Sequence, residues 1–299
     1  MLVMFDYKLL QAFHMVVTTG GFEKAARELF ITQSAVSQRV KLLEEQMGQV
    51  LLSRTSPPRP TPQGLKLLKH FGQVSRLEQD LKADLLPSSE QGFNNLALGV
   101  NADSLATWFP KAVTPLIRTE NLLLNLLVDD QEQTHRFMRQ GKVQGCVSVQ
   151  KNPLQGCKAG YLGYMEYRLL ASSEFTAKWF PHGVDSRSLS QAPGVLFNLK
   201  DELHTKMVSL VLGEKPPTMP LHHIPSVKQF NQLIADGLAY GVLPDQQAGK
   251  RLKSGLLRDL SPGHSLRVRL YWHYWNLKSG LLERFSTGLI KAAQGELPV

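Results

Sequence analysis

The chain has 299 residues, 42% of them hydrophobic and 20% charged, which excludes collagen-like and wholly disordered proteins. Two cysteines, Cys146 and Cys157, are too few for a disulfide framework, so we expect a reducing, cytoplasmic environment. No apolar run is long enough to span a bilayer, and no membrane partner is expected. The net charge of +9 favours a polyanionic partner, but residues 1–93 hold 11 basic and 9 acidic side chains, and residues 94–299 hold 23 and 16. Charge alone therefore supports nucleic-acid binding only weakly.

Residues 1–62 predict a small all-α domain that begins with three helices. Helical spacing of apolar residues, glycine stops and a hydroxyl cap at Thr32 place these helices at about 6–20, 22–30 and 33–47. A short turn separates the second helix from the third. Two helices joined in this way form a helix-turn-helix.

The third helix carries an apolar face and a polar face. Val36, Val40, Leu43 and Met47 repeat at helical spacing and are expected to point inward. The cap and the polar face hold the candidate DNA-binding residues of this helix, Thr32, Gln33, Ser34, Ser37, Gln38 and Lys41. Short polar side chains at a helix N-terminus suit a major groove, because they reach base edges while the positive helix end faces phosphate. A solvated helix face would show the same pattern, but the helix-turn-helix context favours base recognition.

A proline-rich segment at 55–61 predicts a wing. Its prolines fix an extended path and donate no hydrogen bonds, so we expect a rigid hairpin edge rather than a helix. Arg54 and Arg59 flank the turn and are candidate DNA contacts. The alternative is a plain linker with two solvated arginines.

A long helix is predicted over 63–86, where no proline interrupts the chain. It carries a narrow apolar stripe of Leu67, Phe71, Val74, Leu77, Leu81 and Leu85. Such a stripe is typical of a helix that pairs with another helix. We therefore assign residues 63–93 to a linker that contains a dimerisation helix and ends in a breaker-rich hinge. Its candidate interface residues are Leu67, Phe71, Val74 and Leu81.

Residues 94–299 alternate strands and helices, which predicts an α/β domain. Strands at 96–100, 122–128 and 145–149, with helices at 104–118 and 131–140 between them, favour a parallel sheet covered by helices. Further strands are expected at 167–171, 194–198, 222–225, 240–243 and 266–274, and further helices at 227–236 and 281–293.

Catalytic and cofactor motifs are absent from the sequence. It contains no GxSxG, GxGxxG, HExxH or CxxC pattern and no P-loop. We therefore expect no catalytic residues, no cofactor and no metal site, and an enzyme is the least favoured class.

A set of motifs within residues 5–65 is specific enough to indicate a family. The set comprises FEKAAREL at 22–29, TQSAVSQRV at 32–40, and then Leu43, Glu44, Gly48, Leu51, Leu52 and Arg54. These motifs resemble the LysR-type transcriptional regulators, although Leu52 stands where the family usually has phenylalanine. Residues 54–64, 100–108 and 270–273 are further similar to the ArgP/LysG branch, whose members regulate the export and metabolism of basic amino acids.

The resemblance implies a homodimer or a dimer of dimers that binds double-stranded operator DNA, with RNA polymerase as a further partner if the protein is an activator. Bases or phosphates would be contacted by Gln33, Ser34, Ser37 and Gln38, with Arg54 in the wing. It also implies a two-lobed effector domain like a periplasmic binding protein, with one lobe at 94–166 and 268–299 and the other at 167–267. The branch points to lysine or arginine as effector.

Candidate effector residues follow the first two strands of this domain. Asn101, Asp103 and Ser104 lie at the carboxyl end of a strand, where open α/β sheets bind ligands. A helix that starts at Ser104 would offer free N–H groups to an α-carboxylate, and Asp103 with Asp129 or Asp130 would face cationic nitrogens. Helix capping by Asp103 and Ser104, and a solvated turn at Asp129 and Asp130, are the alternatives.

Two functions from different classes follow from these patterns. The first is a transcription factor whose operator binding or activation responds to a small ligand, lysine or arginine. The second is an architectural or replication-inhibiting DNA-binding protein whose C-terminal domain only supports oligomerisation. Measuring DNA binding with and without amino acids separates the two.

Overall fold

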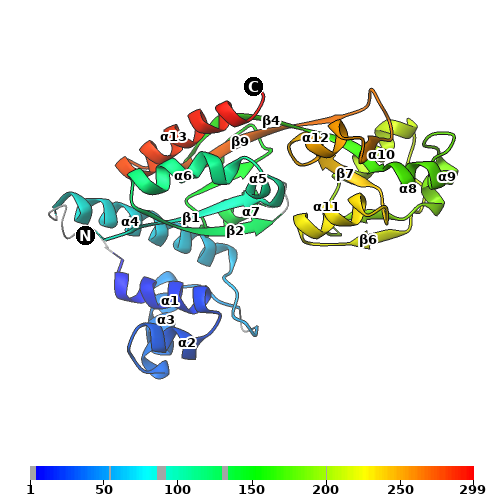
Figure 1. The fold of residues 1–299 in the computed structure, drawn as a ribbon. Coiled ribbons are helices and arrows are strands. Elements are labelled where there is room, and N and C mark those ends of the chain that lie inside the picture. The colour runs from blue at the N-terminus through cyan, green and yellow to red at the C-terminus, as the bar shows by residue number, and fades with distance from the viewer. Residues whose placement is uncertain (1–4, 54, 86–91, 130–133, 200) are drawn as a thin grey trace.

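The computed structural model describes residues 5–53, 55–85, 92–129, 134–199 and 201–299 of the chain. Figure 1 shows a small helical domain, a long helix beside it, and two α/β lobes that are joined by a pair of long strands. None of the helices in the described part of the chain is both long and apolar enough to cross a membrane.

The N-terminal domain packs three helices around one core: α1 (Tyr7–Thr19), α2 (Phe22–Glu28) and α3 (Gln33–Met47). Thr32 and Gly48 cap α3 at its two ends, as predicted. The buried side chains come from all three helices and include Leu10, Phe13, Ala25, Val36 and Leu43. The predicted helix-turn-helix is confirmed.

The proline-rich segment folds back on itself before α4 (Pro62–Leu85) begins. Thr61 N–H donates to Leu51 O at 2.9 Å, and Leu52 forms an antiparallel bridge with Pro60. The predicted wing is therefore present as two short extended pieces that a few hydrogen bonds hold together.

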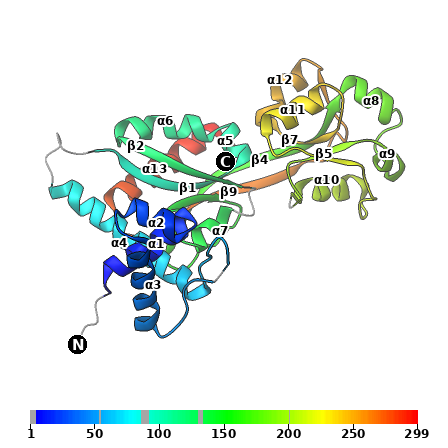
Figure 2. The same cartoon turned by 90° about the horizontal axis from the view of Figure 1, so that it is seen from below.

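The long helix α4 lies between the N-terminal domain and the C-terminal half, residues 92–299 (Figures 1 and 2). On one side, Leu65, Leu67 and Phe71 pack against the core of the helical domain. On another side, Gly72 approaches the indole ring of Trp275 so closely that a Cβ would lie 3.0 Å from it. This helix therefore touches both halves of the molecule.

The C-terminal half consists of two lobes. The first lobe holds β1 (Asn94–Asn101), β2 (Leu122–Asp129) and β3 (Gly145–Ser148), with α5 (Ala102–Ala106), α6 (Phe109–Thr119), α7 (Thr134–Arg139) and α13 (Gly280–Glu296). The second lobe holds β5 (Gly194–Leu196), β6 (Leu221–His223), β7 (Gly241–Pro244) and β8 (Leu257–Asp259), with α8 (Ser173–Trp179), α9 (Ser186–Gln191), α10 (Leu203–Leu212), α11 (Val227–Ala235) and α12 (Asp245–Lys253).

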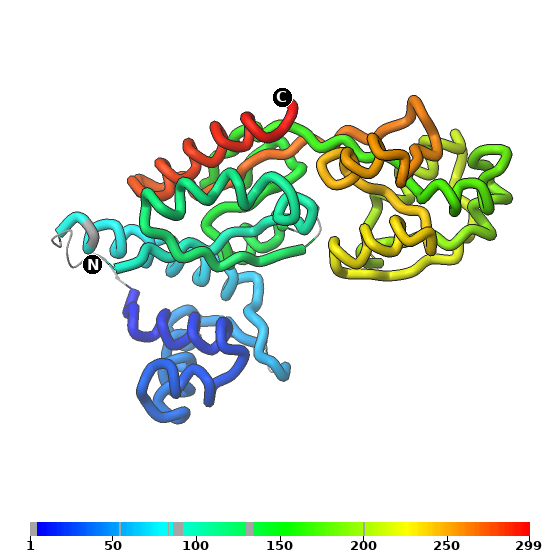
Figure 3. Tube along the Cα trace, in the orientation of Figure 1, coloured from blue at the N-terminus to red at the C-terminus, as the bar shows by residue number. Residues whose placement is uncertain are grey.

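Two strands, β4 (Cys157–Ser172) and β9 (Leu266–Trp275), cross between the lobes, and the tube in Figure 3 traces both crossings. The main sheet has the order β2-β1-β3-β9-β4-β7, with β8 also paired to β4. β1 runs parallel to β2 and β3, whereas β9 runs antiparallel to β3 and β4. The sheet is therefore mixed, and the parallel arrangement predicted for the first three strands is confirmed. The lobe borders at 166/167 and 267/268 stay predictions.

Two elements differ from the sequence-based expectation. The strand expected at 167–171 is the much longer β4, because its first half pairs with β9, a long-range contact that local periodicity does not reveal. The helix expected at 104–118 is divided into α5 and α6 at Thr107, whose φ of −125° and ψ of −92° are not helical. Pro110 lies in the first turn of α6, where a missing N–H costs nothing. Helices α8, α9, α10 and α12 and strand β8 were not expected.

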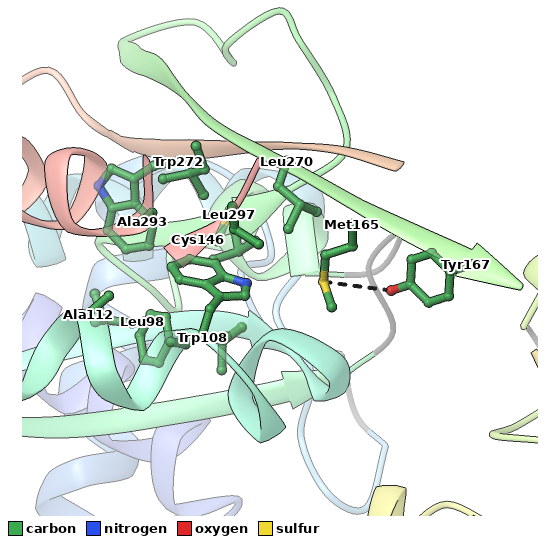
Figure 4. Close-up of a cluster of buried hydrophobic side chains, with 14 of the residues drawn as sticks. Leu98, Trp108, Ala112, Cys146, Met165, Tyr167, Leu270, Trp272, Ala293 and Leu297 are labelled. Carbon is green, nitrogen blue, oxygen red and sulfur yellow. Dashed lines mark hydrogen bonds between the residues drawn. The ribbon is translucent and has the colours of Figure 1, made fainter. Parts of the chain in front are cut away.

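The core of the first lobe gathers large side chains from helices and strands (Figure 4). Trp108 precedes α6, Trp272 lies on β9, and both are almost completely buried. Tyr167 lies at the edge of this cluster in Figure 4, on the part of β4 that leaves the first lobe. This position brings its hydroxyl to the boundary between the lobes.

Candidate functional site

The polar face of α3 is open to solvent. The structure exposes every residue predicted there: Thr32, Gln33, Ser34, Ser37, Gln38 and Lys41. The opposite face is buried at Val36, Val40 and Leu43, and Met47 is half-buried. The sequence pattern separated the two faces correctly. These side chains can therefore reach a flat or grooved partner without any rearrangement of the domain.

The wing and α3 both line a groove of about 620 Å³. Its lining includes Gln33 and Glu44 of α3 and Ser53 and Thr55 of the wing. Arg59 is exposed on the wing, as expected. Arg54, the other predicted wing residue, lies outside the described residues.

Glu44 ties α3 to the wing. Its Oε1 atom accepts the N–H of Leu51 at 2.7 Å and the N–H of Leu52 at 3.2 Å. Hydrogen bonds to an ionised acceptor are about twice as strong as neutral ones, so helix and wing are held as one body. Sequence reasoning had used Glu44 only as part of a motif. One signal in the sequence could have revealed this role. Glu44 places a carboxylate beside the apolar face of α3, seven residues before Leu51, where the wing begins.

The predicted dimerisation stripe on α4 divides into two parts. Leu67, Phe71 and Val74 are half-buried, and the first two pack against the N-terminal core. Leu81 is 59% exposed, and its stripe neighbours Leu77 and Leu85 are exposed as well. A groove of about 390 Å³ runs between α1 and α4 and is lined by Tyr7, Lys8, Gln11, Phe71, Ser75, Glu78, Gln79 and Lys82. The second part of the stripe and this groove are open surfaces of α4.

The predicted effector residues that the structure describes lie where β1 and β2 end. Asn101 and Asp129 are register partners on these parallel strands, so they share one edge of the sheet. Asn101 is 2% exposed and Ser104 is completely buried. Neither Asn101 Oδ1 nor Ser104 Oγ has a hydrogen-bond partner among the described residues. Asp130 lies outside the described residues.

The expected roles of Ser104 need a correction. α5 begins at Ala102 rather than at Ser104, and its N-cap, Asn101, makes no side-chain cap bond. Ser104 therefore does not start a helix, and α5 is only five residues long. We assign no carboxylate site to its N-terminus. The alternative in which Asp103 and Ser104 cap a helix is also wrong.

Asp103 joins the two lobes instead. Its Oδ2 accepts the hydroxyl of Tyr167 at 2.9 Å, and its Oδ1 accepts the side-chain N–H of Gln247 on α12 at 2.8 Å. Burial and the negative charge of Asp201 raise the pKa of Asp103, while its two hydrogen bonds oppose this rise. Burial and the Asp103 carboxylate raise the pKa of Tyr167 well above its usual range, so its hydroxyl remains a donor.

Sequence reasoning missed Tyr167, Gln247 and Asp201. Gln247 is 144 residues from Asp103 along the chain, and nothing local marks it as its partner. Asp201 lies in the loop before α10 and acts electrostatically on Asp103 from the second lobe. Together with Asp103, Asn101 and Ser104, it makes the boundary between the lobes rich in hydrogen-bond acceptors. Such a boundary suits a ligand that brings N–H donors and positive charge.

Comparisons with known proteins find relatives over almost the whole chain. Residues 7–65 match the model of the bacterial regulatory helix-turn-helix proteins of the lysR family. The chain is 42% identical over 292 residues to the HTH-type transcriptional regulator ArgP of Aeromonas salmonicida, which covers 98% of each chain. The crystal structure of ArgP from Mycobacterium tuberculosis has a TM-score of 0.87 at 33% identity, over 99% of each chain. Full-length LysG from Corynebacterium glutamicum with bound effector Arg has a TM-score of 0.79 at 30% identity, over 99% of this chain and 100% of LysG.

A substitution at Glu44 tests the connection between helix and wing. Glu44→Ala removes the acceptor of two backbone N–H groups, so we expect the Leu51 and Leu52 amides to exchange hydrogen much faster. Losing hydrogen bonds to a charged group costs about 1.5–3 kcal/mol. Glu45→Ala is the matched control, because Glu45 is an exposed neighbour that pairs with Lys41 at 3.6 Å. Unchanged exchange at Leu51 and Leu52 in Glu44→Ala would contradict this assignment.

Proposed function

Because the chain belongs to the LysR family of DNA-binding transcriptional regulators, we propose that a small cationic amino acid, lysine or arginine, is the effector that modulates its operator binding. The observation that carries this proposal is the acceptor-rich boundary around Asp103. Its carboxylate lies between two lobes, beside buried acceptors of Asn101 and Ser104 that lack partners in the described part of the chain. The arginine bound by LysG, a relative of similar structure, supports the same ligand class.

For DNA recognition we assign the exposed face of α3 to the major groove. Gln33, Ser34, Ser37 and Gln38 have the short donors and acceptors that read base edges, and the N-terminal end of the helix suits phosphate. Thr32 and Lys41 extend this face at its two ends. Arg59, and Arg54 outside the described residues, would contact phosphates from the wing and carry no sequence information.

For the effector we assign Asp103, with Asp129 and Asp130, to the cationic nitrogens, and Asn101 and Ser104 to further donors of the ligand. Asp201, on the second lobe, adds negative charge to the same space. The lobes would be bordered at 166/167 and 267/268, so that the ligand contacts both. A ligand of this kind shifts an equilibrium only if its contacts differ between the lobe arrangements.

Contacts between α4 and the first lobe offer a route from effector to DNA. Lys69 Nζ donates to Gln155 O at 3.1 Å, and Gly72 lies against Trp275. A Cβ on Gly141, which follows α7, would lie 2.8 Å from Lys69 Cα. The end of α7 therefore lies against the helix that carries the DNA-binding domain.

We assign oligomerisation to α4, through Leu67, Phe71, Val74 and Leu81. The exposure of Leu81 and the groove beside Phe71 favour an interface with the same helix of a second chain. The assembly would be a homodimer or a dimer of dimers, and RNA polymerase would be a further partner where the protein activates transcription.

An architectural DNA-binding protein with an inert C-terminal half is not favoured. Buried acceptors that lack partners in the described chain cost stability, as does a buried carboxylate, and a domain used only for assembly gains nothing from them.

The recognition face is tested by alanine substitutions on α3. We expect Ser37→Ala and Gln38→Ala each to weaken binding to an operator selected from random DNA by about 1–3 kcal/mol, with nonspecific binding unchanged. Arg59→Ala should weaken binding to all sequences and reduce the salt slope by about one. Gln46→Ala, exposed on the last turns of the same helix, is the control. If none of the three variants changes affinity or salt slope, the assigned face is wrong.

The α4 interface is tested by a buried charge. Val74→Glu would place an unpaired carboxylate in the proposed interface, which costs several kcal/mol, so we expect a shift towards monomer and a loss of operator binding. Sedimentation measures the shift towards monomer, and gel shifts measure the loss of operator binding. Gln232→Glu adds the same charge to an exposed position of α11 and should leave the assembly intact. A Val74→Glu protein that remains dimeric would rule this interface out.

The effector is tested by calorimetry on the full chain with arginine, lysine and the uncharged analogue citrulline. We expect both cations to bind, citrulline to bind much more weakly, and Asp103→Asn to lose about tenfold or more in arginine affinity. A cation pairs only with the ionised carboxylate. Affinity should therefore be greatest above the raised pKa of Asp103 and should fall as the pH drops through it.

Glu174→Gln removes a carboxylate from the exposed surface of α8 and serves as the control. It should bind arginine as the wild type does. An absence of heat with both arginine and lysine would remove the basic effector and favour the architectural alternative.

A further inference from the structure

The contact between the lobes depends on two donors that approach one carboxylate from different elements. Tyr167 belongs to the part of β4 that pairs with β7, and Gln247 lies on α12. Each donates to a different oxygen of Asp103, at 2.9 Å and 2.8 Å. The first lobe therefore meets the second through a fixed, two-point hydrogen-bonded contact.

The orientation of Gln247 is itself fixed. Its Oε1 accepts from Asn231 Nδ2 at 2.6 Å, and the same Nδ2 donates to Val227 O at 2.9 Å. Because the oxygen of the Gln247 amide is engaged by Asn231, its N–H₂ group must face Asp103. Asn231 thus selects the donor end of Gln247 for the contact between the lobes.

Both donors are also held on one rigid base. Arg168, next to Tyr167, pairs with Asp245 at 2.8 Å, and Asp245 lies in the first turn of α12, two residues before Gln247. The same guanidinium reaches Asp259 at 3.4 Å. This ion pair joins β4 to α12, so Tyr167 and Gln247 move together rather than separately.

The Asp103 carboxylate keeps acceptor capacity after both bonds are made. An ionised carboxylate offers about four lone-pair sites, and the two donors occupy two of them. Three further buried acceptors, Asn101 Oδ1, Ser104 Oγ and Asn231 Oδ1, have no hydrogen-bond partner within the described ranges. A cation can therefore join Asp103 without displacing Tyr167 or Gln247.

We propose that Tyr167 and Gln247 form an interlobe latch, which holds the lobes in contact and orients Asp103 towards a cationic effector. The identity of the ligand in this inference rests on the proposed function. Tyr167 and Gln247 are positioning residues, Asn231 orients the latch, and Arg168 keeps its two donors in register. Effector binding then strengthens an existing contact between the lobes instead of creating one.

Arginine binding to the full chain tests the latch. We expect Tyr167→Phe and Gln247→Ala each to weaken arginine binding about tenfold at neutral pH. Burial and the negative charge of Asp201 raise the pKa of Asp103, and both bonds lower it. Losing either bond should raise the pH at which arginine affinity begins to fall. A merely structural change would not produce this shift. Tyr161→Phe on β4 and Gln246→Ala on α12 are matched controls and should keep the wild-type profile.

A second measurement needs no effector. Spin labels at the exposed positions Thr114 on α6 and Lys250 on α12 report the distance between lobes, with labelled chains diluted into unlabelled protein. We expect Tyr167→Phe and Gln247→Ala to broaden this distance distribution, and the two controls to leave it narrow. Narrow distributions in the latch variants, or unchanged arginine affinity and pH profile, would overturn the latch. If the wild type binds no arginine or lysine but the distributions still broaden, the latch stands and the assigned effector fails.

Discussion

Antiparallel pairing of β4 with β9 is the constraint on which the C-terminal half depends. The pairing begins with Cys157 opposite Trp275 and ends with Tyr167 opposite Leu266, so the same two strands enter both lobes. One bulge, between Tyr161 and Gly163, interrupts it. Gly163 has a φ of 132°, and a Cβ there would lie 2.6 Å from Pro298 O, so glycine is required at this bend.

This pairing also sets where the two functional regions lie. At one end of the strands, Trp275 packs against Gly72 of α4, the helix that carries the DNA-binding domain. At the other end, Tyr167 holds Asp103 between the lobes. Because β4 and β9 run through both lobes, a change in the angle between the lobes acts on the hydrogen bonds that pair them. This paired structure reaches α4 through Trp275. Rigid elements of this kind can carry a change between distant sites.

The interlobe boundary is costly for the folded protein. A carboxylate loses water when it is buried, and two hydrogen bonds replace only part of that hydration. Asn101 and Ser104 add buried acceptors without partners in the described chain. The DNA-binding domain is different, because its core is apolar and its polar recognition face stays in water. The helical domain therefore keeps its recognition face in water, whereas the interlobe boundary buries a carboxylate and further acceptors.

The sequence by itself determined the N-terminal domain. Its helices, the cap at Thr32, the two faces of α3 and the wing all depend on residues within a few positions of one another, and local spacing reveals such elements. It also identified the strand ends that carry Asn101 and Asp129, because strand and helix alternate there at short range. The motifs of residues 22–54 indicated the family for the same reason.

Only the tertiary structure decided the full length of β4, the division of the helix after β1, and the partners of Asp103. The first half of β4 is a strand because β9 lies beside it, about a hundred residues later in the chain. Gln247 meets Asp103 across 144 residues, after two strands and an ion pair at Arg168 have brought α12 to the boundary. Local periodicity does not reveal such contacts, because they form only when distant elements pack together.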